Sequence, residues 1–81
     1  MTYRMNKNRR KRLEEANELL DQAMNIVSEC AEEERECYDN LPESLQYAET
    51  GERMSENADS LEEIPDSIQD IIDQITEIIE S

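Results

Sequence analysis

The stretch LEEIPDSIQDIIDQITEII, residues 61–79, decides the fold. Two sets of apolar residues recur in it every seven positions, and two more isoleucines widen the stripe that they form. The first set is Leu61, Ile68 and Ile75, the second is Ile64, Ile71 and Ile78, and the flanking pair is Ile72 and Ile79. Apolar residues at this spacing gather on one side of an α-helix. The stretch therefore predicts an amphipathic helix whose apolar stripe is broader than one partner helix covers.

This second helix is predicted over about residues 52–80, because Met54 and Ala58 continue the stripe upstream. Pro65 interrupts the pattern. A proline inside a helix removes one hydrogen bond and costs roughly 3 kcal/mol, so a kink near residues 62–65 or a restart there is expected. The apolar phase is the same on both sides of Pro65, which favours the kink.

Residues 41–51, LPESLQYAETG, are predicted to form the connection before that helix. Pro42 suits the start of a single helical turn, and Gly51 is the only glycine that could release backbone strain. Leu41, Leu45 and Tyr47 are expected to cover the end of the hairpin.

The first helix is predicted over about residues 4–40, ending before Pro42 because the residue preceding a proline disfavours the helical region. Its apolar positions alternate in steps of three and four and form a heptad seam. The seam comprises Leu13, Ala16, Leu20, Ala23, Val27, Cys30, Cys37 and Leu41, flanked by Leu19, Met24, Ile26, Ala31 and Tyr38. Glu34 holds the one charged seam position. Its side chain is expected to reach water; the alternative is a buried charge that fixes the register of the two helices.

Cys30 and Cys37 are expected to be small apolar core residues in a reducing, intracellular setting. Seven residues place them about 10 Å apart along the helix, which is too far for a disulfide.

Two such helices joined by a short turn predict an all-α fold, a single antiparallel helical hairpin over residues 1–81. A chain of 81 residues buries only a modest fraction of its surface alone, so a homodimer that forms a four-helix bundle is predicted, with higher oligomers as the alternative. The expected oligomer seam comprises Leu20, Val27, Leu61, Ile64, Ile68, Ile71, Ile72, Ile75 and Ile78.

Charge divides the chain into a basic start and an acidic remainder. The first twelve residues carry six cations and no acid, whereas residues 13–81 hold 22 Asp and Glu against Arg35 and Arg53, so +6 and −20 make up the net −14. The basic arm consists of Arg4, Lys7, Arg9, Arg10, Lys11 and Arg12. A basic arm that runs into a heptad seam is reminiscent of bZIP proteins, but the acidic remainder opposes nucleic-acid binding. Pairing of the arm with the acidic end of the second helix, within one chain or between subunits, is therefore favoured; that end holds Asp70, Asp73, Glu77 and Glu80.

The acidic surface gives the functional hypothesis. Carboxylates along a rod can imitate nucleic-acid phosphates and occupy a basic groove on another protein, although a merely solvated coiled coil would also be acidic. The candidate partner-binding residues are Glu29, Glu32, Glu33, Glu36, Asp39, Glu43, Glu49 and Glu52.

Other classes of function lack their residues. The chain has no His, no nucleophile with a nearby base and no glycine-rich phosphate loop, so enzymatic activity and cofactors are not expected. Two cysteines without His make no zinc site, and the carboxylates of residues 32–36 are predicted to lie on straight helix rather than on a loop that bends around calcium. No apolar run suits a signal peptide or a membrane span, so a cytoplasmic protein without membrane contact is expected.

The segment ECYDNLPESLQ, residues 36–46, followed by GERM at residues 51–54, resembles a motif of small acidic helical-hairpin proteins of unknown function from Firmicutes and their phages. Those proteins share an Arg-rich start, a "DNLPESLQ"-type turn and a second helix rich in Asp, Glu, Ile and Leu. The chain departs from that pattern with Tyr38 in place of Phe and with Pro65 in the second helix. The resemblance implies the hairpin, and a phage origin would imply a small inhibitor in the cytoplasm of a bacterial host.

The combined expectation is a non-enzymatic acidic binding protein, a phage-encoded inhibitor that blocks a basic surface of a host or defence protein. The alternative is a coiled-coil assembly module, with nucleic-acid binding through the basic arm ranked last.

Overall fold

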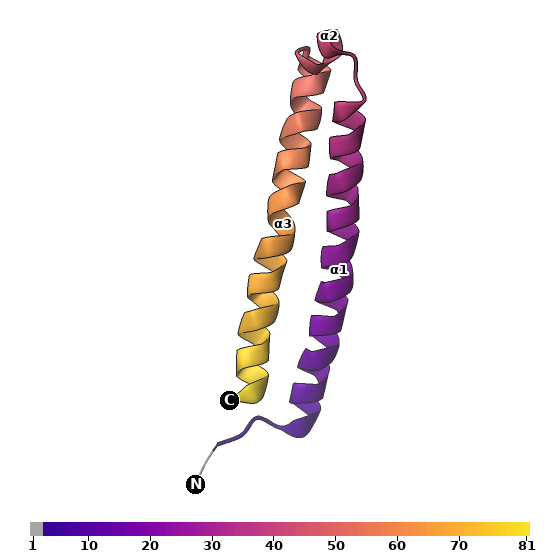
Figure 1. Ribbon diagram of the computed structural model, residues 1–81. Coiled ribbons are helices and arrows are strands. Elements are labelled where there is room, and N and C mark those ends of the chain that lie inside the picture. Colours follow the sequence, from indigo (N-terminus) through magenta and orange to yellow (C-terminus); the bar gives the residue numbers. More distant parts are fainter. Residues whose placement is uncertain (1–2) are drawn as a thin grey trace.

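The computed structural model describes residues 3–81 and forms a rod of 68 × 16 × 13 Å (Figure 1). Helix α1 spans Lys7–Asp39, the single turn α2 spans Glu43–Gln46, and α3 spans Glu49–Glu80. The long helices α1 and α3 run antiparallel and pack along one another. The prediction of an all-α chain with two long paired helices is confirmed.

Helix α1 begins at Lys7 rather than near Arg4 because Asn6 caps it. The Asn6 side-chain oxygen accepts hydrogen bonds from the backbone N–H groups of Asn8, at 2.8 Å, and Arg9, at 3.3 Å. These are donors that the first turn of a helix cannot satisfy internally.

The connection contains the predicted helical turn. The Pro42 carbonyl accepts from the N–H groups of Leu45, at 2.9 Å, and Gln46, at 3.1 Å, which closes α2. The Gln46 side-chain amide donates to the carbonyls of Tyr38 and Leu41, both at 3.2 Å, and so ties α2 to the end of α1. Of the three residues expected to cover the end of the hairpin, only Leu41 is half-buried, because Leu45 and Tyr47 point largely into solvent.

Replacing Gln46 with Ala is expected to lower the free energy of unfolding by about 1–2 kcal/mol, because the Leu41 carbonyl loses its side-chain donor and the Tyr38 carbonyl keeps only the Leu41 N–H, at 3.1 Å. Urea denaturation followed by far-UV circular dichroism would measure the change. Ser44→Ala, at an exposed position of the same turn, is the matched control and should be nearly neutral. Equal stability of the two variants would contradict this role for Gln46.

Gly51 lies inside α3 and has no positive φ, so the prediction that it releases backbone strain is wrong. Its role is close approach, since the residue is buried against the backbone of α2. Helix α3 also begins earlier than predicted, at Glu49, and continues past Pro65 as one element.

Two side-chain pairs fix the register of the long helices. The Asn17 amide donates to the Thr76 hydroxyl at 3.2 Å, and Arg35 Nε donates to Glu62 Oε1 at 3.0 Å. Half-buried and buried residues follow a heptad on each helix. The seam of α1 is Leu13, Asn17, Leu20, Met24, Val27, Ala31, Glu34 and Tyr38, continued by Leu41 just beyond the helix, and that of α3 is Gly51, Met54, Ala58, Leu61, Pro65, Ile68, Ile72, Ile75 and Ile79.

The seam of α1 differs from the predicted one at every second position. Asn17, Met24, Ala31 and Tyr38 take the places expected for Ala16, Ala23, Cys30 and Cys37, each one residue later. Both cysteines are exposed free thiols, so their assignment to the core is wrong. Both sets repeat every seven residues, and packing selected the set with the larger side chains, Met24 and Tyr38.

The core between the two helices is thin. Ala31 and Ala58 are the only buried apolar side chains among residues 3–81, and no large side chain is fully buried there. The Asn17 side-chain oxygen is buried and has no hydrogen-bond partner in the described part of the chain, which marks a polar layer in the seam.

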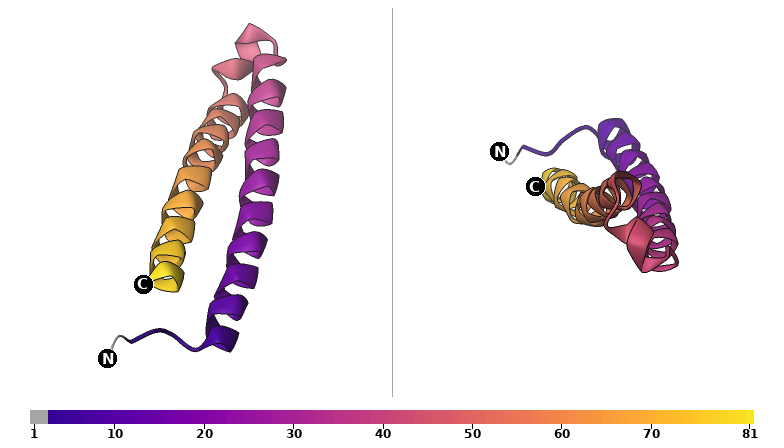
Figure 2. Two further views of the ribbon diagram at one scale, coloured as in Figure 1. Left: turned by 60° about the horizontal axis from the view of Figure 1, so that its bottom comes forward. Right: turned by 90° about the horizontal axis from the view of Figure 1, so that it is seen from above.

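The basic arm does not pair with α3 of its own chain. Within residues 3–81 all ion pairs belong to Arg35, so the expected contacts with Asp70, Asp73, Glu77 and Glu80 are not formed. The register explains why, because Ser81 reaches only to about the level of Arg12, and the start of α1 projects beyond the end of α3 (Figure 2).

Candidate protein-binding surfaces

The seam divides the hairpin into two flanks of different chemistry. Arg35 directly follows the seam residue Glu34, and its partner Glu62 directly follows the seam residue Leu61. Residues that directly follow seam residues therefore lie on one flank on both helices, and residues that directly precede them lie on the other. The first flank is rich in carboxylates, and the second is apolar over much of its length.

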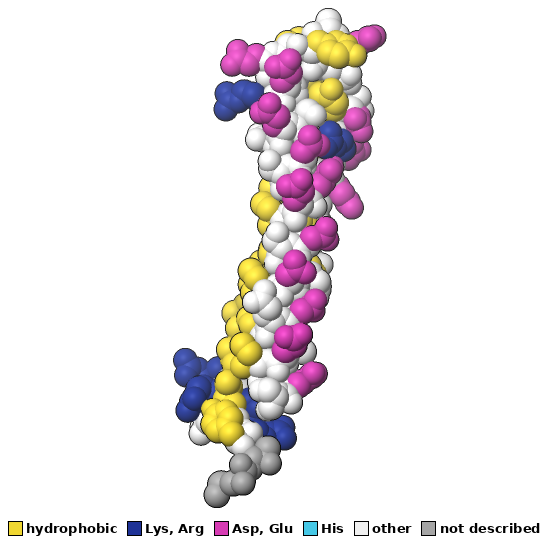
Figure 3. Space-filling model, turned by 90° about the vertical axis from the view of Figure 1, so that its left-hand side faces the viewer, with side chains coloured by type: hydrophobic (Ala, Val, Ile, Leu, Met, Phe, Trp, Pro, Cys, Tyr) yellow, Lys and Arg dark blue, Asp and Glu magenta, His cyan; other side chains and the backbone are white. Residues whose placement is uncertain are grey.

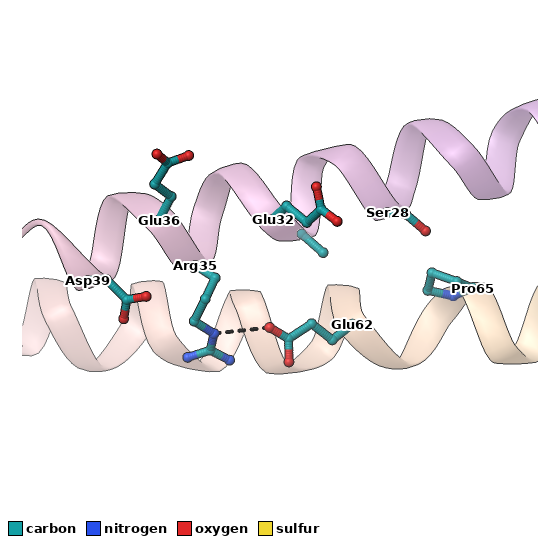
Figure 4. Close-up of a pocket in the computed structure, with 8 residues that line it drawn as sticks. Ser28, Glu32, Arg35, Glu36, Asp39, Glu62 and Pro65 are labelled. Carbon is teal, nitrogen blue, oxygen red and sulfur yellow. Dashed lines mark hydrogen bonds and ion pairs between the residues drawn. The ribbon is translucent and has the colours of Figure 1, made fainter.

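An open groove of about 430 Å³ lies on the acidic flank (Figure 4). Ala31 and Pro65, one from each helix, contribute apolar surface to it. The remaining lining residues are polar or charged: Ser28, Glu32, Arg35, Glu36, Asp39 and Glu62. We call this the acidic groove.

Arg35 crosses the gap between the helices. Its guanidinium forms ion pairs with Glu62 and with Asp59, both on α3. Hydrogen bonds to Glu62 and then Asp59 raise the pKa of Arg35 above its ordinary value, so this residue remains a cation. The groove still carries more negative than positive charge, because Glu32, Glu36 and Asp39 have no ion-pair partner within residues 3–81.

The structure brings together only part of the predicted acidic set. Glu32, Glu36 and Asp39 line the acidic groove, and Glu29 lies one turn before Glu33 on exposed helix. Glu33 itself precedes a seam residue and therefore lies on the opposite flank. The remaining members lie near the turn: Glu43, Glu49 and Glu52.

Two carboxylates of the site were missed by the sequence interpretation. Asp59 and Glu62 belong to α3, and they meet α1 only through the antiparallel register. Arg35, the only cation between residues 13 and 52, was the available signal, because a lone cation at the edge of a seam attracts carboxylates from the facing helix.

The opposite flank exposes large apolar side chains at heptad spacing. On α1 these are Leu19 and Ile26, and on α3 they are Ile64, Ile71 and Ile78, with exposed fractions between 39% and 66%. These five residues define the apolar face. Figure 3 shows hydrophobic side chains along one edge of the lower half of the rod and carboxylates on the other side.

The residues predicted as one oligomer seam are thus divided between two surfaces. Ile64, Ile71 and Ile78 belong to the apolar face and are exposed. The others lie in the seam between α1 and α3: Leu20, Val27, Leu61, Ile68, Ile72 and Ile75.

Residues 3–81 contain no helix that is both long and apolar enough to cross a membrane. In the same part of the chain, no three His, Cys, Asp or Glu side chains come together as a set of metal ligands. The surfaces that remain for recognition are the acidic groove, the apolar face and the projecting arm.

Comparisons with protein-family models, with curated proteins and with solved structures found no match for this chain.

Proposed function

We propose that this chain is a non-enzymatic protein-binding module whose acidic groove captures a basic surface of another protein. The observation that carries the proposal is the composition of the groove, where carboxylates from both helices surround the apolar surface of Ala31 and Pro65. Lys and Arg side chains combine an apolar stem with a charged end, so both parts find complementary surface there. Capture of a basic surface that the partner itself needs would make the module an inhibitor.

The charge distribution supports a protein partner over nucleic acid. The net charge of −14 repels phosphates, and it accelerates encounter with basic proteins. The projecting arm is the one basic region, and it carries six cations at one end of the rod.

The test is affinity capture from a bacterial lysate with mass spectrometry, repeated at increasing salt. Captured proteins should be basic and should dissociate as ionic strength rises well above physiological, where charges are screened within less than about 8 Å. A variant that combines Glu32→Gln, Glu36→Gln and Glu62→Gln should lose the partner.

The matched control removes the same three charges elsewhere, with Glu14→Gln, Glu15→Gln and Glu18→Gln. These residues are exposed on α1 outside the groove, so the control should retain capture. Salt-insensitive capture, or equal loss in both variants, would refute recognition by the acidic groove.

A second candidate function, assembly, is favoured by the apolar face. Monomeric proteins rarely expose contiguous apolar patches of this kind, and the thin core of the hairpin leaves these side chains without cover. We propose that the chain self-associates through this face, as a dimer of hairpins that forms a four-helix bundle.

The free energy gained by burying the apolar face is comparable to the free-energy cost of forming a dimer. Full burial of a Leu or Ile side chain contributes about 1.5–3 kcal/mol, so covering the exposed parts of five such side chains in both copies yields about 10 kcal/mol. Association costs about 4–15 kcal/mol in lost translational and rotational freedom. The face alone gives marginal association, and further complementary contacts would decide it.

A further inference from the structure

We propose that the second copy covers the apolar face in the antiparallel orientation, with the basic arm of each copy beside the acidic half of the other. The inference rests on the proposed self-association and adds the arrangement of the two chains. It follows from the order of side chains along the apolar flank.

On α1 the row of side chains along this flank is complementary to the same row in reverse order. Arg12, Leu19, Ile26 and Glu33 each directly precede a seam residue and lie seven residues apart. When this row is placed antiparallel to a copy of itself, Arg12 meets Glu33 and Leu19 meets Ile26. Opposite charges and apolar side chains therefore match in a single register.

The residues between these positions allow the two α1 helices to approach closely. Ala16, Ala23 and Cys30 precede the other seam residues on the same flank, and all three are small. In the antiparallel arrangement Ala23 faces its own counterpart, and Ala16 faces Cys30 of the second copy.

The isoleucines of α3 have the same midpoint. Ile71 lies halfway between Ile64 and Ile78, so an antiparallel copy of α3 pairs Ile64 with Ile78 and Ile71 with itself. The register set by the Asn17–Thr76 and Arg35–Glu62 pairs places Ile71 at about the level of Ala23. One two-fold axis at this level satisfies both helices.

The alternative, parallel arrangement lacks this match. A two-fold axis along the rod would keep the two rods parallel but exchange the two sides of the apolar face. Helix α1 of one copy would then lie over α3 of the other. Arg12 and Glu33 would then face the flank of α3 near Ser81 and Ile64, where the side chains that precede seam residues are uncharged. Arg53, the one charge on that flank of α3, lies beyond the overlap of antiparallel copies.

Cross-linking tests the orientation. In a Cys30→Ser/Cys37→Ser background, Ala23→Cys should link two chains rapidly with a short bis-maleimide, because the introduced thiols lie at the axis. Ala16→Cys in the same background is the control, since antiparallel copies hold that position about 20 Å from its counterpart. Both variants change an alanine of the same row, so their folding can be compared directly.

Charge reversal tests the register. Arg12→Glu and Glu33→Arg should each raise the dimer dissociation constant about tenfold, and the double variant should restore it. Lys11→Glu and Asp21→Lys make the same kinds of charge change on the other flank, where Lys11 follows the half-buried Arg10 and Asp21 follows the seam residue Leu20 outside the acidic groove, and they should leave dimerisation unchanged.

Light scattering on the native chain distinguishes failure of the proposed self-association from failure of the antiparallel arrangement alone. A monomer at micromolar concentration, or a chain whose apolar face binds only a different protein, would overturn both self-association and the antiparallel arrangement. A dimer in which Ala23→Cys does not cross-link, or in which the double charge reversal does not restore affinity, would overturn the antiparallel arrangement alone.

Discussion

Replacing Gly51 with Ala is expected to destabilise the hairpin by about 2 kcal/mol, although Ala is the better helix former. Inside a helix Ala is favoured over Gly by about 1 kcal/mol, so helix propensity alone predicts a gain in stability. A Cβ at Gly51 would lie 2.5 Å from the Gln46 carbonyl oxygen and 2.7 Å from its carbon, and it would also overlap the carbonyl oxygen of Leu45. All three atoms belong to the backbone of α2, so relief requires moving the connection that joins the long helices.

Urea denaturation at a fixed protein concentration would measure the effect, because self-association makes apparent stability depend on concentration. Thr50→Ala is the matched control: Thr50 is exposed and adjacent, so its replacement should change stability by no more than about 0.5 kcal/mol. A more stable Gly51→Ala variant would show that α2 does not approach α3 this closely in solution.

The hairpin itself was predictable because its signals are local. Heptad spacing marked both long helices, and Pro42 marked the turn between them. Asn6 also carried a readable signal, since asparagine is a preferred N-cap and the observed helix starts one residue later.

The phase of the first helix was not predictable from spacing. The rows containing Cys30 and Ala31 both repeat every seven residues, and exchanging one row for the other rotates the centre of the contact surface by about 50°. Only the packing of Met24 and Tyr38 against the facing helix selects one of them. The same choice decides whether the cysteines are buried, so the error in the phase carried into their assignment.

The surfaces depend on that phase even more strongly. The acidic groove needs Glu62 beside Arg35, and the apolar face needs Ile71 on the same flank as Leu19. Each surface combines residues that are far apart in sequence, so it forms only when α1 and α3 pack in this register. The sequence could indicate a broad apolar stripe but not which isoleucines remain exposed.

The fold changes the interpretation of the basic arm and the acidic remainder of the chain. The start of the arm extends past the end of α3, and among residues 3–81 the arm forms no ion pair. In the proposed antiparallel dimer, Arg12 of each copy meets Glu33 of the other. The acidic grooves lie on the flanks that this dimer leaves uncovered, so self-association and capture of a basic partner are compatible.

Replacing Ile71 with Glu is expected to abolish self-association while the hairpin stays helical. Ile71 is 46% exposed in a single chain and lies at the proposed two-fold axis, so the substitution removes apolar contact and places two carboxylates face to face. We expect the dimer dissociation constant to rise at least about a hundredfold, because desolvating an unpaired charge adds to the lost burial. Sedimentation velocity would measure this change, and circular dichroism would report the helix content.

The neighbouring residue supplies the contrast. Ile72 belongs to the seam between α1 and α3, so Ile72→Glu should unfold the hairpin and lower the helix content at any concentration.

Ile71→Lys should dissociate the dimer as Ile71→Glu does, because both substitutions remove the same apolar contact. This result is expected although Ile71→Lys reduces the net negative charge. If Ile71→Lys leaves the dimer intact, general charge repulsion rather than the apolar face controls association. If Ile71→Glu and Ile72→Glu unfold alike, the two isoleucines do not lie on separate surfaces and the division between seam and apolar face is wrong.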